Sequence, residues 1–89
     1  MIRAGKYRAT LVTWLDAVSD GGWKSPEAYK KTSLIKCKSL GFLLSMDKER
    51  VILVQQATHD AVTVSDSVTI PRKAVVSIEV LDVEKPKVR

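Results

Sequence analysis

The sequence predicts a mainly all-β protein, folded as one five-stranded small barrel with a short helical turn inserted after its first strand. Three observations predict this fold class. Apolar and polar residues alternate in several short segments, and polar reversals separate these segments. Gly41 interrupts the longest apolar segment, and a glycine inside a strand often marks a sharp bend. Pro71 separates two alternating segments within residues 67–81, so two strands meet there at a tight corner.

The first strand is expected at residues 6–15, which are rich in β-branched and aromatic side chains. Leu11 and Leu15 share one face of this strand, and Val12 and Trp14 share the other. Because both faces carry apolar residues, we expect the second face to be covered as well as the first.

A turn with two adjacent glycines separates this strand from a short helix. Ser25 is a suitable N-cap, and Pro26 is favoured at the first helical position. The helix is expected to end near Thr32. A helix of about two turns is marginal by itself, so we expect Trp23 and Tyr29 to hold it by packing.

Four further strands are expected in the rest of the chain. The first is long and bends at Gly41, and a polar reversal leads to the second. Asp66 breaks the apolar series of the third strand, which indicates a bulge or bend. The expected strands cover residues 34–45, 51–56 and 62–70, and a final segment through Val76, Ile78 and Val80.

Eighty-nine residues make one domain, which we expect at residues 1–82, followed by a flexible basic tail at 83–89. Hydrophobic residues make up 45% of the chain and aromatic residues only 6%, so Val, Ile and Leu have to form the core. Because such a core is thin, we expect a homo-oligomer.

Several classes of protein are disfavoured. No apolar run approaches the roughly 18 residues that span a bilayer, and the first residues lack a signal-peptide pattern, so we expect no membrane partner. A single cysteine, Cys37, excludes an internal disulfide and favours a reducing cytoplasm. Cys37 alternates with Ile35, so we expect a buried structural thiol.

The formal net charge is +5, and its distribution is uneven. Five lysines lie within residues 24–38, where Glu27 is the single acidic residue. This excess is compatible with phosphate binding. It is equally compatible with a solvated surface that keeps a small protein soluble.

The sequence predicts a binding protein rather than an enzyme, without a cofactor or metal. Cys37 and His59 are the single residues of their types, and nucleophilic catalysis needs a nucleophile beside an oriented base. His59 and Asp60 supply two adjacent groups, whereas a metal site usually takes three or four. The glycine pair Gly21-Gly22 lacks the flanking pattern of a phosphate-binding loop.

Two tryptophans are the first candidates for ligand binding. Trp14 and Trp23 flank a tight loop and could form a slot for a planar base, where stacking is worth roughly 1–3 kcal/mol per base. Asp16 and Ser19 would then bind the polar edges of that base. The alternative is that the tryptophans pack on each other and pin the insertion over the barrel.

Basic residues are the second candidates. Lys36 and Lys38 lie on the bent strand, and Arg72 and Lys73 lie in the last tight turn. If the strand and the turn are neighbours, these four side chains can converge on a phosphate. The alternative is a solvated corner.

The bent strand with Gly41, the polar reversal at Met46-Asp47-Lys48 and the ending IPRKAVVSIEVL resemble an Sm-like small barrel. The resemblance covers residues 34–81, and it implies ring assembly and RNA binding. The chain departs from that family in the place of its helix, which lies between Trp23 and Thr32 rather than before the first strand.

A second resemblance spans nearly the whole chain and implies expression in a bacterial cytoplasm. The chain is similar to small bacteriophage proteins with no assigned activity, through Trp14, Asp16, Ser19, Gly22-Trp23, Gly41-Phe42-Leu43 and Ile70-Pro71.

Three functions are therefore expected, in this order. The first is an oligomeric phage-type binding protein that holds a small anionic ligand such as a nucleotide, and so sequesters a host defence signal, or that binds a host protein. The second is an Sm-like RNA- or DNA-binding protein. The third is a minor structural component of a virion that joins its neighbours through exposed strand edges.

Overall fold

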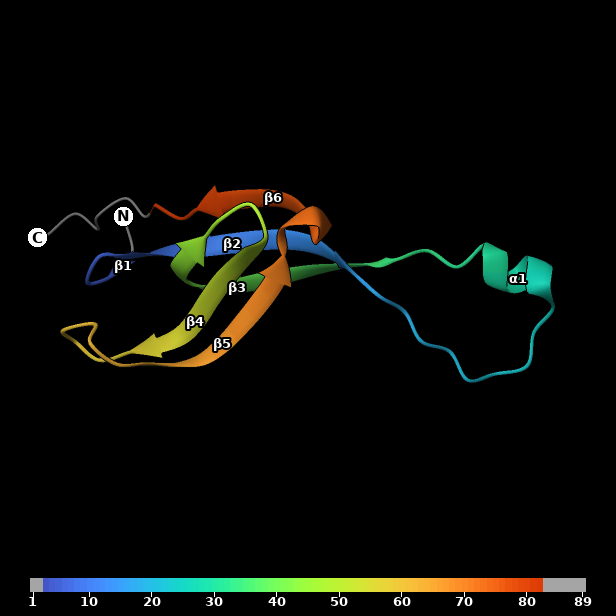
Figure 1. The fold of residues 1–89 in the computed structure, drawn as a ribbon, viewed down its shortest axis with the longest axis horizontal. Coiled ribbons are helices and arrows are strands. Elements are labelled where there is room, and N and C mark those ends of the chain that lie inside the picture. Colours follow the sequence, from blue (N-terminus) through green and yellow to red (C-terminus); the bar gives the residue numbers. More distant parts are fainter. Residues whose placement is uncertain (1–2, 83–89) are drawn as a thin grey trace, which may run out of the picture.

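The computed structural model describes residues 3–82 as an antiparallel β protein with one short α-helix (Figure 1). The prediction of a mainly β fold is confirmed. The expected basic tail at 83–89 lies outside the described residues. In chain order the elements are β1 (Arg3–Ala4), β2 (Tyr7–Asp16), α1 (Pro26–Lys30), β3 (Ile35–Met46), β4 (Arg50–Ala57), β5 (Val64–Pro71), the 3-10 turn η1 (Arg72–Ala74) and β6 (Val75–Val80).

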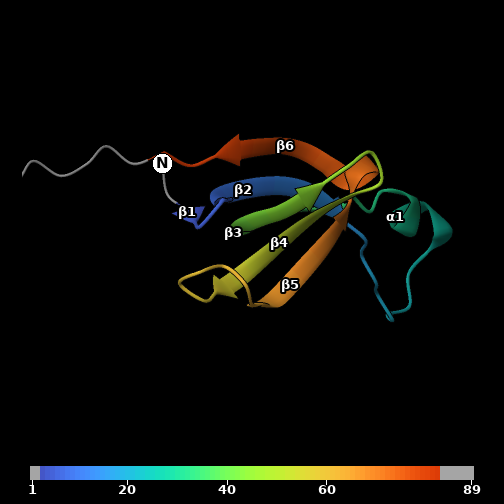
Figure 2. The same ribbon diagram turned by 60° about the vertical axis from the view of Figure 1, so that its left-hand side comes forward.

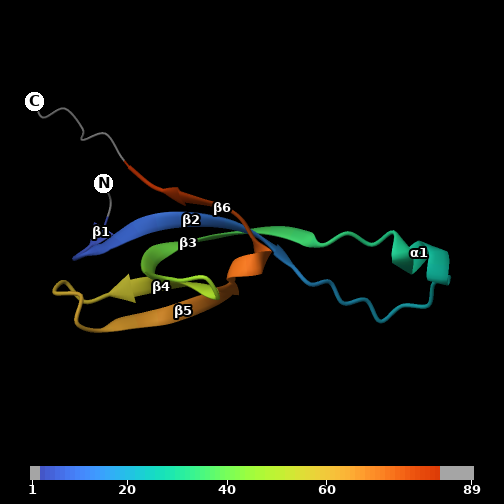
Figure 3. The same ribbon diagram turned by 45° about the horizontal axis from the view of Figure 1, so that its top comes forward.

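The strands form one antiparallel sheet in the order β6–β2–β3–β4–β5, and β1 makes a short hairpin with the start of β2. Figure 3 shows β2, β3 and β6 in one layer and β4 and β5 in a second layer beneath it. The edge strands β5 and β6 do not pair with each other within residues 3–82, and η1 joins them. The sheet is therefore bent into two layers but open at its edges.

β3 takes part in both layers because it bends at Gly41. Residues 35–42 pair with β2, whereas β4 pairs with residues from Phe42 onward. A Cβ atom at Gly41 would lie 2.8 Å from the carbonyl oxygen of Val54 and 3.2 Å from Cβ of Leu53. The change of partner strand falls next to Gly41, where the close approach of β4 leaves no room for a side chain, and the register of β3 against β4 shifts between Leu43 and Ser45.

The core lies between the two layers and consists of aliphatic side chains, as the composition predicts. Four fully buried side chains form one cluster, and the half-buried side chain of Trp14 packs against them. The fully buried residues of this cluster are Val12, Val51, Leu53 and Ile70. Because this set is small, other large apolar residues, such as Leu40 and Val76, remain exposed on the sheet.

Two backbone features have conformations that few residues adopt. Gly5 turns the chain between β1 and β2 with a φ of 55°. The strand β1 is not predicted from the sequence, because two residues are too few to show alternation. Asp66 has a φ of 58°, so the irregularity predicted at this position of β5 is confirmed.

Residues 17–34, here called the arm, project from the sheet between the end of β2 and the start of β3 (Figures 1 and 2). Asp16 and Ile35 lie directly opposite each other in the ladder and form its base. The molecule is 61 Å long but measures only 32 by 23 Å in the other directions. The projecting arm accounts for this elongated shape.

The helix of the arm begins as the sequence predicts. Ser25 is the N-cap, since its Oγ accepts a hydrogen bond of 3.2 Å from the backbone N–H of Ala28. Pro26 occupies the first helical position. The helix ends at Lys30, two residues before the expected end at Thr32, and none of its residues is buried.

No helix within residues 3–82 has the length and the apolar composition needed to cross a membrane.

Candidate functional site

Trp14 belongs to the arm-side end of the core. It lies on the face of β2 that carries Val12, between Cys37 of β3 and Val75 of β6. Its indole Nε1 donates a hydrogen bond of 3.0 Å to Oγ of Ser39. Packing against the core and the hydrogen bond from Nε1 therefore fix the position of the ring.

Trp23 lies on the arm, and its side chain is 102% exposed, so no other residue covers it. The proposed slot between Trp14 and Trp23 is consequently not formed, and the alternative of direct packing between the two rings is not formed either. The expectation that Trp23 packs against the helix is wrong for the same reason. The physical cause is the projection of the arm away from the sheet.

The two polar residues predicted beside the slot are both exposed. Asp16 accepts a hydrogen bond of 2.8 Å from the backbone N–H of Ala17 through Oδ1, so it caps the chain where the arm leaves β2. Ser19 lies on the arm itself. The structure does not bring these residues together with both tryptophans.

Local contacts order the loop around Trp23. Asp20 accepts hydrogen bonds from the N–H of Gly22 at 2.8 Å and from Nζ of Lys24 at 2.7 Å. Both hydrogen bonds lower the pKa of Asp20, and the bond from Lys24 has the larger effect. The hydroxyl of Tyr29 donates to the carbonyl of Gly22, and Lys24 Nζ lies 5.6 Å from the centre of the Tyr29 ring. These contacts hold the tip of the arm in one conformation while the tryptophan stays outside.

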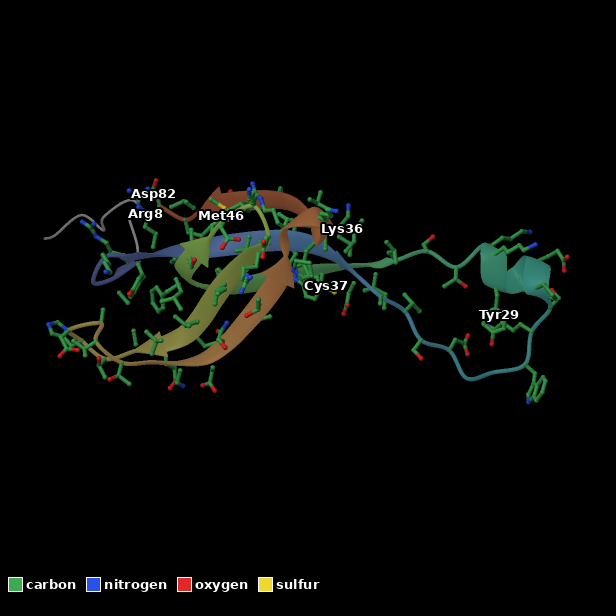
Figure 4. All side chains as sticks on the ribbon, in the orientation of Figure 1. Arg8, Tyr29, Lys36, Cys37, Met46 and Asp82 are labelled. Carbon is green, nitrogen blue, oxygen red and sulfur yellow. The ribbon has the colours of Figure 1, made fainter. Side chains whose placement is uncertain are left out.

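The four predicted basic residues lie at the base of the arm, on both sides of β2. Lys36 and Lys38 lie on the outer face of β3, opposite Leu15 and Thr13 of β2. Figure 4 shows Lys36 at this end of the sheet and Arg8 at the opposite end.

Arg72 and Lys73 form the corner η1, which precedes Val75, the partner of Trp14 on the other side of β2. The bent strand and the last turn are therefore separated by one strand rather than adjacent. Within the described part of the chain, neither these two residues nor the lysines of β3 form an ion pair. Arg72 is anchored by its backbone N–H, which donates to the carbonyl of Glu49 at 2.9 Å.

An apolar cleft on the outer face of the sheet has a volume of about 270 Å³ and is lined by Ala9, Leu40, Gly41, Phe42, Gln55 and Leu81. Gln55 Nε2 donates a hydrogen bond of 2.6 Å to the carbonyl of Leu40, which holds one wall in place. The sequence analysis does not name this cleft. The signal for it is the presence of apolar residues on both faces of β2 and β3.

A second cavity, of about 180 Å³, lies at the end of the β4–β5 hairpin and is lined by Gln56, Ala57, Thr58, Thr63, Val64 and Ser65. None of the predicted binding residues lines either cavity. Neither of these two cavities within residues 3–82 is therefore a site at the tryptophans or the lysines.

Cys37 lies on β3, whereas His59 lies in the loop between β4 and β5. Cys37 is half-buried rather than buried as predicted, because it lies at the end of the core beside the arm; its Sγ lies 3.8 Å from the carbonyl oxygen of Ile35. Asp60 accepts bonds from the hydroxyl of Thr58 and then from the N–H of Val62, and these contacts lower its pKa. No group of three or more His, Cys, Asp or Glu residues within residues 3–82 is arranged to hold a metal ion.

No family model, no curated protein and no solved structure matches this chain.

Proposed function

We propose that this chain is a non-enzymatic binding protein that holds single-stranded nucleic acid on the basic residues at the base of its arm. The observation that carries the proposal is the group Lys36, Lys38, Arg72 and Lys73, here called the basic surface, whose members are not paired with acids in the described residues. Cations without acidic neighbours attract phosphates and release counterions when they bind them.

The secondary structure supports this use of the basic surface. Lys36 and Lys38 are two residues apart on one face of a strand, so their Cα atoms are about 7 Å apart and both side chains point outward. The strand is held by pairing with β2 at both positions. A rigid strand therefore holds the two lysines at a fixed spacing. Binding to the regularly spaced phosphates of a nucleic acid requires such a fixed spacing.

An extended ligand fits this surface better than a small nucleotide. Sites for small molecules are usually enclosed cavities of about 300–1,000 Å³. The basic residues line neither of the two described cavities. An open surface with separated cations instead suits a phosphate chain that continues past each contact.

The strand order also supports the Sm-like small-barrel interpretation. Five strands follow one another as β6–β2–β3–β4–β5, one glycine-bent strand serves both layers, and a three-residue turn joins the edges. We propose that this open sheet is a small barrel of that type.

Binding of a labelled oligothymidylate, measured by fluorescence anisotropy at several salt concentrations, tests the function. We expect the logarithm of the association constant to fall linearly with the logarithm of salt concentration, by about 0.7 for each phosphate contacted. The Lys36→Glu variant should bind more weakly and with a smaller slope. Lys6→Glu is the matched control, because Lys6 lies in the turn before β2, at the end opposite the arm.

Two results would count against nucleic-acid binding. One is an affinity that does not change with salt, and the other is an equal effect of the Lys36 and Lys6 substitutions. Tight binding of a mononucleotide with little dependence on salt would favour a small anionic ligand instead.

A further inference from the structure

Two apolar features of this molecule have no partner within residues 3–82. One is Trp23 at the outer part of the arm, with its full side-chain surface exposed. The other is the apolar cleft on the outer face of the sheet, where Leu40 is 53% exposed. A fully exposed tryptophan and an apolar cleft on one molecule are candidates for a contact, because large exposed apolar surfaces tend to mark interaction sites.

The cleft has the size and lining for one large side chain. Its volume of about 270 Å³ lies below the range of about 300–1,000 Å³ that is typical of small-molecule sites. Leu40 and Phe42 form its walls opposite Leu11 and Ala9 of β2, and the N–H of Leu81 donates to the carbonyl of Ala9 at 2.9 Å. The lining is mostly apolar, and its shape is maintained by the ladder.

Among the exposed apolar side chains of residues 3–82, Trp23 is the largest and the most exposed, so it suits such a cleft. An aromatic residue of this kind buries about 150–250 Å² when it is enclosed. The loop that carries it is ordered by the bonds of Asp20 to Gly22 and Lys24. Because the loop is already ordered, little conformational entropy is lost when the ring is buried.

In this conformation the tryptophan does not reach the cleft of its own chain. The arm leaves β2 after Asp16, whereas Ala9 of the cleft lies seven residues back along the same strand, about 24 Å away. From that end the arm extends further from the cleft (Figure 1). With the arm in this conformation, a ring that enters the cleft comes from a second copy of the chain.

The charges of the two regions are complementary. The arm carries Lys30 and Lys31, which form no ion pair in the described residues. The strand β6, which pairs with β2 beside the cleft, carries Glu79 opposite Leu11.

Arg8 is the basic residue next to Ala9, and its position in β2 places it on the opposite face of that strand. The outer face at the cleft therefore carries Glu79 opposite Leu11, and Lys38 lies on the same face two residues from Leu40. Lys30 and Lys31 of the approaching arm can pair with the carboxylate of Glu79. This pairing favours a contact between unlike ends of two molecules.

We propose that copies of this chain assemble head to tail, with Trp23 of one copy seated in the cleft of Ala9, Leu40, Phe42 and Leu81 of the next. The two contacting surfaces differ, so the interface is heterologous and can continue into a ring or a filament. This assembly does not depend on the proposed nucleic-acid binding, because no residue of the basic surface lines the cleft, and Lys36, four residues from Leu40, lies further from it than Lys38 does.

Sedimentation velocity over roughly 1 µM to 1 mM, a range that detects weak association, tests the assembly. We expect the weight-average sedimentation coefficient to rise with concentration for the natural chain. Trp23→Ala and Leu40→Arg should each weaken association by about 30-fold or more, the effect of losing a central anchor. Val76→Arg is the matched control, because Val76 is 54% exposed on β6 and does not line the cleft.

A mixing experiment identifies the two surfaces directly. Trp23→Ala retains an intact cleft, and Leu40→Arg retains an intact arm. Each variant alone should remain monomeric, while an equimolar mixture should form a dimer through the one remaining contact. A mixture that stays monomeric, a natural chain that stays monomeric up to about 1 mM, or an equal effect of the Val76 control would each overturn the proposal. Lys36→Glu should leave association unchanged, which separates this result from the nucleic-acid test.

Discussion

At the residue scale, two glycines of this chain have opposite environments. Gly41 lies where β3 passes close to β4, and an added Cβ would meet the backbone oxygen of Val54 at 2.8 Å. Gly21 lies on the arm, where an added Cβ would meet no atom within 4 Å. The first glycine is required by packing between strands, whereas the second occupies open space.

We expect Gly41→Ala to lower the free energy of unfolding by about 1–3 kcal/mol, because a backbone atom cannot move aside as a flexible side chain can. Urea denaturation followed by circular dichroism measures the change. Gly21→Ala is the matched control, and it should leave the free energy unchanged or raise it slightly, since alanine restricts the unfolded chain. Equal stability of the two variants would show that β4 does not approach Gly41 so closely.

The two tryptophans show at the same scale how environment decides the role of a residue. Trp14 packs against the core and donates its Nε1 proton to Ser39. Trp23 has the same ring but no neighbour that covers it. Composition and spacing do not distinguish the environments of the two tryptophans. The direction of the arm decides that one is packed and the other exposed.

At the element scale, the arm is ordered by short-range hydrogen bonds rather than by burial. Asp20 bonds to residues two and four positions further along the chain, and Ser25 caps a helix of five residues. None of residues 17–34 is buried, and Tyr29 alone among them is half-buried. Opening of the arm should therefore cost much less free energy than unfolding of the sheet.

We expect Ser25→Ala to destabilise α1 locally by about 1 kcal/mol, since the substitution removes the acceptor for the N–H of Ala28. Amide hydrogen exchange at Ala28 should become about 5-fold faster. The thermal midpoint of the sheet should not change. Ser19→Ala is the matched control on the same arm, because Ser19 caps no helix. A lower thermal midpoint for Ser25→Ala would show that the helix supports the core.

At the scale of the whole molecule, the chain is far from spherical. Its radius of gyration is 17.4 Å, whereas a compact chain of this length has one of about 12 Å. The larger radius of gyration arises from the arm, which extends from the sheet and buries none of its residues. A segment that buries nothing within its own chain is a suitable element for contact with another molecule.

We expect the sheet to fold without the arm. Asp16 and Ile35 are directly paired, so an Asn-Gly dipeptide between them, replacing residues 17–34, makes a two-residue hairpin turn. Because no buried residue is removed, the thermal midpoint should stay within about 4 °C of that of the natural chain. Differential scanning calorimetry measures the midpoint. Loss of cooperative unfolding would show that the arm contributes to the core.

The strands could be predicted from the sequence because the patterns that indicate them extend over only a few residues. Alternation indicated the segments of β2 through β6, Gly41 indicated the bend, and Ser25 with Pro26 indicated the start of α1. Local patterns could not show whether the predicted binding slot between the two tryptophans forms. Its formation required Trp23 to fold back toward Trp14, and no local pattern reports the direction in which a loop leaves a sheet.

The sequence by itself determined which segments are extended and where one of them bends, since side-chain periodicity and the properties of glycine and proline act within a few residues. Only the tertiary structure decided that the arm projects and that the basic residues lie on both sides of β2. It alone also decided that Leu40 and Phe42 enclose an outer cleft with Leu81. These arrangements depend on the pairing of distant strands, whose register is set by packing of the sheet as a whole.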